Sequence, residues 1–264
     1  MRATRLTSLV LVILSISQLA VARQTSSSST QASQLLQRSL AALQGNTSVN
    51  DVTLSGTARR IAGSDDESGT VTVKGLSGGT NRIDLSLSSG PRSEIRSVSI
   101  SGPSGSWSGP DGVAHSIAYH NLVTDSGLLP LFTIASILSN TNSVVTLIGP
   151  ETRNGQSVIH LTAVQQFPLL TRDSAALQQR LSKMDIYLDA ATNLPASFVY
   201  NTHPDNNALL DIAVEIQFSD YRNVSGSQIP FHIQKFLNNS LLLDLQFQYA
   251  ALNTGLTAAQ VGAQ

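Results

Sequence analysis

The segment with the clearest resemblance to a catalytic motif is GSWSG, residues 105–109. A serine-hydrolase elbow needs serine at the centre of G-x-S-x-G, where the sharp turn exposes its hydroxyl as a nucleophile. Here the glycines have the required spacing, but Trp107 occupies the centre. The segment therefore predicts a turn-flanked strand with Trp107 packed, and no nucleophile.

Histidine positions give no metal site. His115 and His120 are five residues apart, which is not the three-or-four spacing that pairs ligands on a helix. The chain contains no cysteine and no H-E-x-x-H. We therefore predict neither a metal nor a cofactor. His160 and His232 sit in predicted strands opposite polar neighbours, which favours solvated or hydrogen-bonded surface positions.

Three aspartates, Asp185, Asp189 and Asp211, could in principle supply the carboxylate pair of a glycosidase. They occupy polar positions of alternating strands, where exposed acids are ordinary, and sequence gives no distance between them. A secreted hydrolase is therefore the least favoured alternative, and we predict that the protein is not an enzyme.

The N-terminus predicts export. Residues 1–22, MRATRLTSLVLVILSISQLAVA, have the charged, apolar and small-residue order of a secretory signal that ends in an A-x-A site. Residues 23–30 are serine-rich and predict a flexible leader, and residues 31–264 predict a single domain. With no cysteine for a lipid anchor, we expect the mature protein to be soluble after export.

Composition excludes some partners. Charged residues make up 12% of the chain, the net charge is −1, and no long basic run occurs. Phosphate-backbone binding therefore lacks electrostatic support, and we predict no nucleic-acid partner. Without disulfides, stability must come from burial of apolar surface.

Two periodicities organise the rest of the chain. Leucines at three-and-four spacing predict a helix over residues 32–43, which Gly45 ends. From residue 51 apolar and polar residues alternate, with turns at Gly78-Gly79, Asn154-Gly155 and residues 191–193. Short helices are predicted at residues 118–125 and 171–183, the latter capped by Asp173.

These patterns predict an α+β fold that is mostly antiparallel β. About ten or eleven strands are joined by hairpins, and parallel crossovers would need a helix each time. A sheet of this size curls or splits. A curved open sheet, or half-barrel, covered by a few helices accounts best for the helical segments.

The most informative of these is residues 128–138, which are apolar on nearly all sides. They form either a core helix or a lid over a hydrophobic ligand, and the two interpretations overlap. The predicted hydrophobic ligand-binding residues come from this helix and from the apolar stripe at 212–218: Leu128, Leu131, Phe132, Ile134, Ile212, Val214, Ile216 and Phe218.

The hairpin FSDYRNVSGSQIPFHIQ, residues 218–234, has a predicted reversal at Asn223–Gly226. Pro230 lacks an N–H, which predicts an edge strand or a bulge. Asp220 and Arg222 share a strand face and are expected to form an ion pair.

Three segments carry a resemblance to a known family: MDIYLDAATNLPASFVY, FSDYRNVSGSQIPFHIQKF and LLLDLQFQYAALNTGL. They resemble strands and turns of the periplasmic lipoprotein-carrier superfamily, which includes the carrier that shuttles lipoproteins to the outer membrane. The resemblance implies a half-barrel, a periplasmic location and an apolar, lipid-like ligand. None of the matching residues is catalytic.

We therefore expect an exported, non-enzymatic periplasmic protein that binds or carries a lipid or lipid-modified molecule. Its partner would be a hydrophobic ligand or lipoprotein, with transient membrane contact. The alternative is a structural or interaction module of envelope assembly with a filled core. The sequence leaves ligand identity and oligomeric state open.

Overall fold

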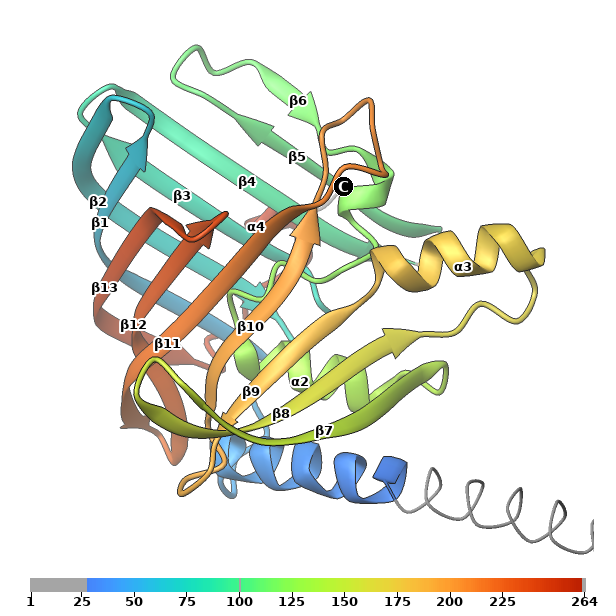
Figure 1. Cartoon of the computed structure of the whole chain (residues 1–264). Helices are drawn as coiled ribbons and strands as arrows, with labels where there is room; N and C mark the ends of the chain where they lie inside the picture. The colour runs from blue at the N-terminus through green and yellow to red at the C-terminus, as the bar shows by residue number, and fades with distance from the viewer. Residues whose placement is uncertain (1–27, 100, 263–264) are drawn as a thin grey trace, which may run out of the picture.

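Alternation of apolar and polar residues runs through most of the chain, and the strands that it produces form one antiparallel sheet. The computed structural model describes residues 28–99 and 101–262 (Figure 1). The predicted signal peptide and most of the predicted leader lie outside the described residues. The leader prediction is wrong at its end, because residues 28–30 are already helical.

Thirteen described strands pair in the order β6-β5-β4-β3-β2-β1-β13-β12-β11-β10-β9-β8-β7, so the sheet is open. The strands are β1 (Asp51–Ala62), β2 (Asp65–Leu76), β3 (Asn81–Leu87), β4 (Gly90–Ser99), β5 (Gly102–Ser108), β6 (Ala114–Ser116), β7 (Ser143–Arg153), β8 (Gln156–Gln165), β9 (Met184–Asp189), β10 (Pro195–Thr202), β11 (Ile212–Val224), β12 (Ser227–Leu237) and β13 (Ser240–Leu252).

The predicted fold class is confirmed, but the predicted strand number was too low. β6 has only three residues, which is too short for a period of two to be recognised. In β1 the alternation is interrupted by Gly56 and by the Arg59-Arg60 pair. Both strands are nevertheless held by ladder pairing to long neighbours.

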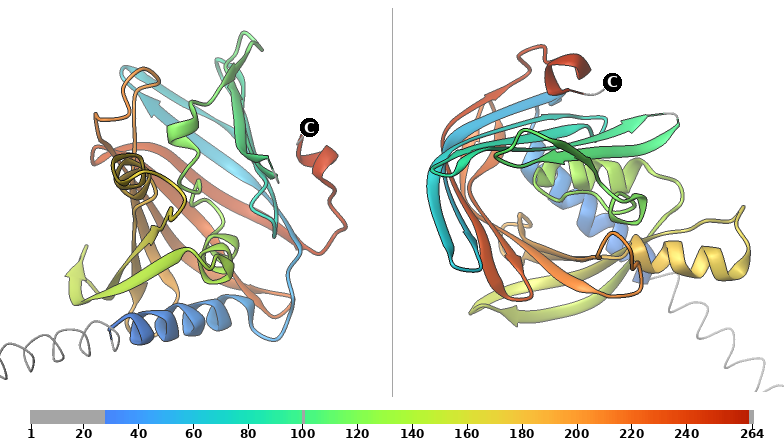
Figure 2. Two further views of the ribbon diagram at one scale, coloured as in Figure 1. Left: turned by 90° about the vertical axis from the view of Figure 1, so that its right-hand side faces the viewer. Right: turned by 90° about the horizontal axis from the view of Figure 1, so that it is seen from above.

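The sheet curves strongly, and its apolar residues form a core on the concave side (Figure 2). Two glycines allow strands to approach closely at this curvature. A Cβ at Gly56 would overlap the carbonyl oxygen of Gln246, and one at Gly69 would overlap that of Ser86. Any other residue at either position would force the neighbouring backbone to move.

Two helices, the N-terminal helix and the helix at residues 130–139, cover the concave side and its lower opening (Figure 2). The N-terminal helix covers residues 28–44, followed by α2 (Pro130–Ser139), α3 (Arg172–Leu181) and the short α4 (Ala258–Val261). The predicted helix at 118–125 is reduced to one 3-10 turn, η1 (Tyr119–Asn121). The N-cap of α3 is Thr171, and Asp173 lies in the first turn, so its predicted capping role is wrong.

The β11–β12 turn docks against the end of the N-terminal helix. Gly45 follows that helix at φ 59°, and a Cβ there would overlap the carbonyl oxygen of Gly226. Thr47 Oγ1 donates to the Ser225 carbonyl at 2.9 Å, and Ser227 Oγ donates to that of Gln44 at 3.0 Å. The turn thus fixes the helix to the sheet.

The reversal predicted at Asn223–Gly226 is confirmed, since β11 ends at Val224 and β12 begins at Ser227. The Asp220–Arg222 pair is also confirmed, with Nε 3.1 Å from Oδ1. An edge position for Pro230 is wrong, because β12 lies between β11 and β13. The β11–β12 register does not shift at Pro230, so the predicted bulge is not found either; only Asp220, at φ 52°, departs from the ladder there.

Asp51 holds the segment that follows the last strand. Its carboxylate, 3% exposed, accepts hydrogen bonds from the backbone N–H groups of residues 254–256 at 2.8–3.2 Å and from Thr254 Oγ1 at 2.9 Å. Burial alone would raise the pKa of Asp51, but these hydrogen bonds outweigh it and leave the pKa below its ordinary value.

We expect Asp51→Asn to lower the free energy of unfolding by about 2 kcal/mol at neutral pH, because buried donors lose their ionised acceptor. Since the pKa of Asp51 is depressed in the folded state, its contribution is complete above about pH 4 and is lost as pH falls through the folded pKa. Urea unfolding of both proteins at several pH values checks this. A difference that stays constant down to acidic pH would contradict it.

Candidate functional site

Helix α2 lies inside the curve of the sheet (Figures 1 and 2). Pro130 occupies its first turn, where no helical N–H is needed, and residues 130–134 are buried. The helix approaches β2 at Gly75, where a Cβ would overlap Leu129 Cδ1 and lie 3.5 Å from the Phe132 ring. The absence of a side chain at Gly75 therefore allows the start of α2 to pack closely against β2.

The predicted ligand-binding residues are brought together by the fold. Seven of them are buried in one continuous core between α2 and the concave face: Leu128, Leu131, Phe132, Ile134, Val214, Ile216 and Phe218. Ile212 is only half-buried at the start of β11 and is not part of that core. With α2 in this position, these side chains pack on one another.

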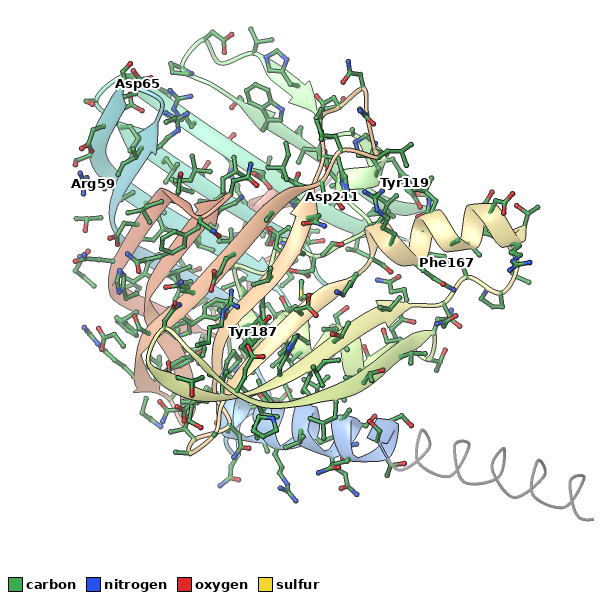
Figure 3. All side chains as sticks on the ribbon, in the orientation of Figure 1. Arg59, Asp65, Tyr119, Phe167, Tyr187 and Asp211 are labelled. Carbon is green, nitrogen blue, oxygen red and sulfur yellow. The ribbon has the colours of Figure 1, made fainter. Side chains whose placement is uncertain are left out.

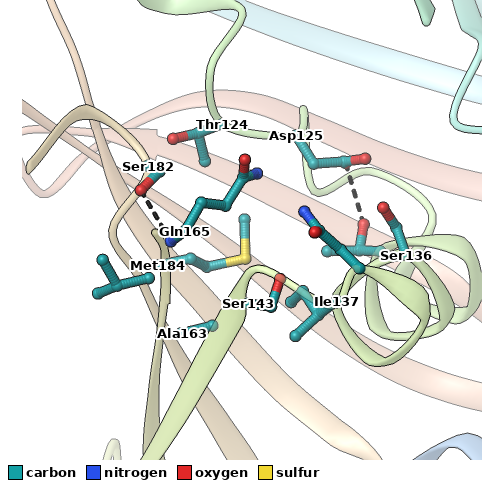
Figure 4. A pocket seen from close by; sticks show the side chains of 12 residues that line it. Thr124, Asp125, Ser136, Ile137, Ser143, Ala163, Gln165, Ser182 and Met184 are labelled. Carbon is teal, nitrogen blue, oxygen red and sulfur yellow. Dashed lines mark hydrogen bonds between the residues drawn. The ribbon is translucent and has the colours of Figure 1, made fainter. Parts of the chain in front are cut away.

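The cavities bordering α2 are small, with volumes of about 50 and about 10 Å³. The larger lies beneath the C-terminal half of the helix and is lined by both polar and apolar side chains (Figure 4). Thr133 Oγ1 donates to Asp125 Oδ1 at 3.0 Å on one side, and the Gln165 N–H donates to Ser182 Oγ at 3.0 Å on the other. This volume suits one or two water molecules.

The N-terminal and C-terminal halves of α2 are thus attached differently. The first half is buried in apolar contacts, whereas Ser136 and Ser139 are exposed and Ile137 borders this larger cavity. The loop before the helix is held firmly, because Arg96 Nη1 donates to the Asn121 carbonyl at 2.9 Å and Tyr200 Oη donates to that of Ser126 at 3.0 Å. The helix is anchored at its start.

A larger groove, about 630 Å³, opens at the lower end of the sheet. Its apolar lining includes Ala42 of the N-terminal helix, Leu194 and Pro195 of the β9–β10 turn, and Phe218. Tyr221 also lines it and donates from Oη to the Pro195 carbonyl at 2.9 Å. Burial raises the pKa of the Tyr221 phenol well above its ordinary value, so this group stays a neutral donor.

Of the predicted ligand-binding residues, only Phe218 lines this groove, together with the candidate acid Asp189. The two turns that build it were recognisable as separate motifs, DAATNLP and FSDYRNVSGSQIP. Their proximity depends on the β9–β12 register, which alternation alone does not supply.

Each of the three candidate acids is held by a different set of hydrogen-bond or ion-pair partners. Asp185 binds His160 Nε2 and Thr162 Oγ1, Asp189 closes the β9–β10 turn with Thr192, and Asp211 pairs with Arg180. Burial alone would raise the pKa of each carboxyl, but hydrogen bonds lower each pKa below its ordinary value. None therefore has the raised pKa of a glycosidase general acid.

The other polar candidates have structural surroundings. His232 Nε2 lies 2.8 Å from Asp244 Oδ1, which agrees with the predicted hydrogen-bonded position, as does the His160 contact. Trp107 is 43% exposed and stacks on His115 with ring centroids 4.4 Å apart, so the predicted packing is only partial. On the outer face, Tyr187 stacks with His160 beneath Arg153 (Figure 3).

Within the described residues, no group of three or more histidines and acids is arranged to hold a metal ion. None of the helices among residues 28–99 and 101–262 has the length and apolar character needed to cross a membrane.

Solved structures share this fold. A domain from Vibrio parahaemolyticus, assigned to outer membrane lipoprotein sorting, has a TM-score of 0.57 at 12% identity and covers 89% of this chain and 97% of its own. A LolA superfamily protein from Nitrosomonas europaea gives 0.54 at 11% identity, covering 87% and 96%. A DUF1329 family protein from Desulfovibrio piger gives 0.53 at 10% identity, covering 88% and 96%.

The resemblance to the lipoprotein-carrier superfamily is therefore confirmed for the fold. At these identities the likeness shows architecture alone. Neither a scan against protein-family models nor a search of curated proteins found a match for the sequence.

Proposed function

We propose that this protein is exported to the periplasm and there binds or carries a lipid or lipid-modified molecule without catalysing a reaction. The observation that carries the proposal is the position of α2. This helix covers the apolar concave face. In a β-sandwich, a second sheet would cover that face instead. The sorting role assigned to the Vibrio domain of the same fold supports it.

The route for a ligand follows from the unequal attachment of α2. Its C-terminal half borders a cavity and contributes only the partly buried Ile137 and Leu138 to the core, so moving that half outward breaks fewer apolar contacts than moving the buried first half would. The anchored start of the helix serves as the pivot. An acyl chain would then enter beneath the C-terminal half of α2 and reach the buried core that includes Ile134, Val214 and Ile216, which were predicted from sequence to bind ligand.

The second candidate is an interaction module of envelope assembly. One observation favours it, namely that the concave face is filled when α2 is in place. Such a module would use the edge strand β7, where Val144 is 42% and Ile148 is 58% exposed. An exposed edge can pair with a strand from a partner.

The test is recovery of lipid from protein purified without detergent, by organic-solvent extraction and mass spectrometry. We expect lipid near equimolar amounts, because ligands of apolar pockets co-purify when most of their surface is buried. The outer-face variant Ile148→Ser should retain the lipid, since its side chain lies outside the core. Repeated absence of lipid, with a crosslinked partner on β7, would support the interaction module instead.

A further inference from the structure

Charged side chains line the concave face beyond its apolar part. They are Arg60 of β1, Glu67 of β2, Arg92, Glu94 and Arg96 of β4, and Lys235 of β12, and we call this group the ionic rim. Side chains in the interior of a curved sheet are normally apolar, because burying charge is costly unless it is paired. The rim therefore requires an explanation.

Strand register shows which face these residues occupy, because directly paired residues share a face. Lys235 pairs with Ile216 and with Leu243, both of which contribute to the apolar core. On β4, Arg92 pairs with Leu85, and Glu94 pairs with Ile83. Leu85, Ile83 and Ile216 are buried core residues, so the rim continues the face that α2 covers.

The rim has more positive than negative charge. Glu67 is shared by Arg60 Nη1 at 3.2 Å and Arg92 Nη2 at 3.6 Å. Glu94 binds Arg96 Nε at 2.7 Å. Burial would raise the pKa of Glu94, but the positive charges of Arg96 and Lys235 lower it below its ordinary value.

The rim as defined thus has four cations and two carboxylates, in a chain whose net charge is −1, and Asp65, which shares this face at the β1–β2 turn, is exposed. Asp125, in the loop before α2, also acts on Arg96, but it is engaged by the Gly127 N–H and by Thr133. The buried Nε of Arg92 has no hydrogen-bond partner among the described residues. The rim therefore retains both charge and a donor for an anion.

We propose that the ionic rim binds the anionic headgroup of an amphiphile whose acyl chain lies along the apolar part of the same concave face. The inference rests on the proposed function, and it adds the ligand class. Along β12 the change from apolar to charged occurs between Ile233 and Lys235, two residues apart on one face. An anionic lipid likewise changes from apolar to charged where its acyl chains join the headgroup.

Water can reach the rim. The five ion-paired side chains are 8–30% exposed, and Trp107, which pairs with Glu94 across the β4–β5 ladder, is partly exposed beside them. A headgroup can therefore approach from solvent while its chain is covered by α2.

The experiment compares lipids with identical acyl chains by titration calorimetry: dioctanoyl-phosphatidylglycerol, dioctanoyl-phosphatidylcholine and dioctanoylglycerol, with inorganic phosphate as the free anion. We expect the phosphatidylglycerol to bind about fivefold more tightly than the other two lipids, as one partly exposed charge contact provides. Lys235→Met should remove most of this preference, and Lys235→Arg should keep it.

Lys74→Met is the matched control, because Lys74 lies on the opposite face of β2 from Val73 and should leave the preference unchanged. Urea midpoints verify that each variant is folded, and Lys235→Gln replaces the methionine variant if it is not. Equal affinity for all three lipids would overturn the rim proposal and leave the proposed function intact. If phosphate alone matched phosphatidylglycerol, the site would be one for free anions, which would also overturn the rim proposal. If none of the lipids bound, both proposals would fail.

Discussion

Gly45→Ala should lower the free energy of unfolding by about 3 kcal/mol, through backbone strain and steric overlap together. The residue has φ 59°, which costs any side chain about 1 kcal/mol or more. Its new Cβ would also overlap the Gly226 carbonyl oxygen. Because that contact joins the N-terminal helix to the β11–β12 turn, we expect partial undocking of the helix.

Urea unfolding and hydrogen exchange of residues 31–44 measure the effect. Gly63→Ala is the matched control, because Gly63 has φ 62° and a Cβ added there would meet no neighbouring group within 4 Å. It should cost only about 1 kcal/mol, the conformational part alone. Equal losses for the two variants would show that the contact with Gly226 contributes nothing.

Phe132→Ala should cost about 3–4 kcal/mol, because it removes a ring that is 5% exposed between α2 and the sheet. If the concave face accepts lipid, the space left is apolar and an acyl chain can fill it. Added dioctanoyl-phosphatidylglycerol should then stabilise this variant more than the wild type. At ten times Kd the ligand contributes about 1.4 kcal/mol.

The comparison uses thermal or urea unfolding with and without the lipid. Tyr187→Ala truncates an aromatic ring that is 6% exposed on the outer face of β9, outside the concave core. This variant should lose a comparable free energy of unfolding. The lipid should stabilise it no more than it stabilises the wild type. Equal recovery of the two variants would mean that lipid does not enter beside α2.

Local patterns predicted much of this fold. Pro130 followed by an apolar run identified α2, and strict alternation identified β11 with Val214, Ile216 and Phe218 on one face. The prediction was wrong where local preference was overridden. Asp173 is a good capping residue, but Thr171 has the extended backbone that an N-cap requires.

The candidate sites depended on information that local patterns lack. Lys235 continues the alternation of Ile229, Phe231 and Ile233, so its face could have been read from sequence. Its relation to Glu94 could not, because β12 and β4 are separated by four other strands of a curved sheet. The groove that includes Leu194 and Tyr221 likewise needs the register of two hairpins.

The pairing of β1 with β13 has a consequence for how the chain folds. Val52 pairs with Leu252 in the middle of the sheet, so the first and last strands join two halves that are each built of neighbouring hairpins. Pairing of β1 with β13 closes a loop that contains all the other described strands. We expect this pairing to be the slow step of folding, because the chain loses conformational entropy before the contacts form. Each half keeps an open edge until the last strand arrives, so a chain still lacking its last residues cannot complete its sheet.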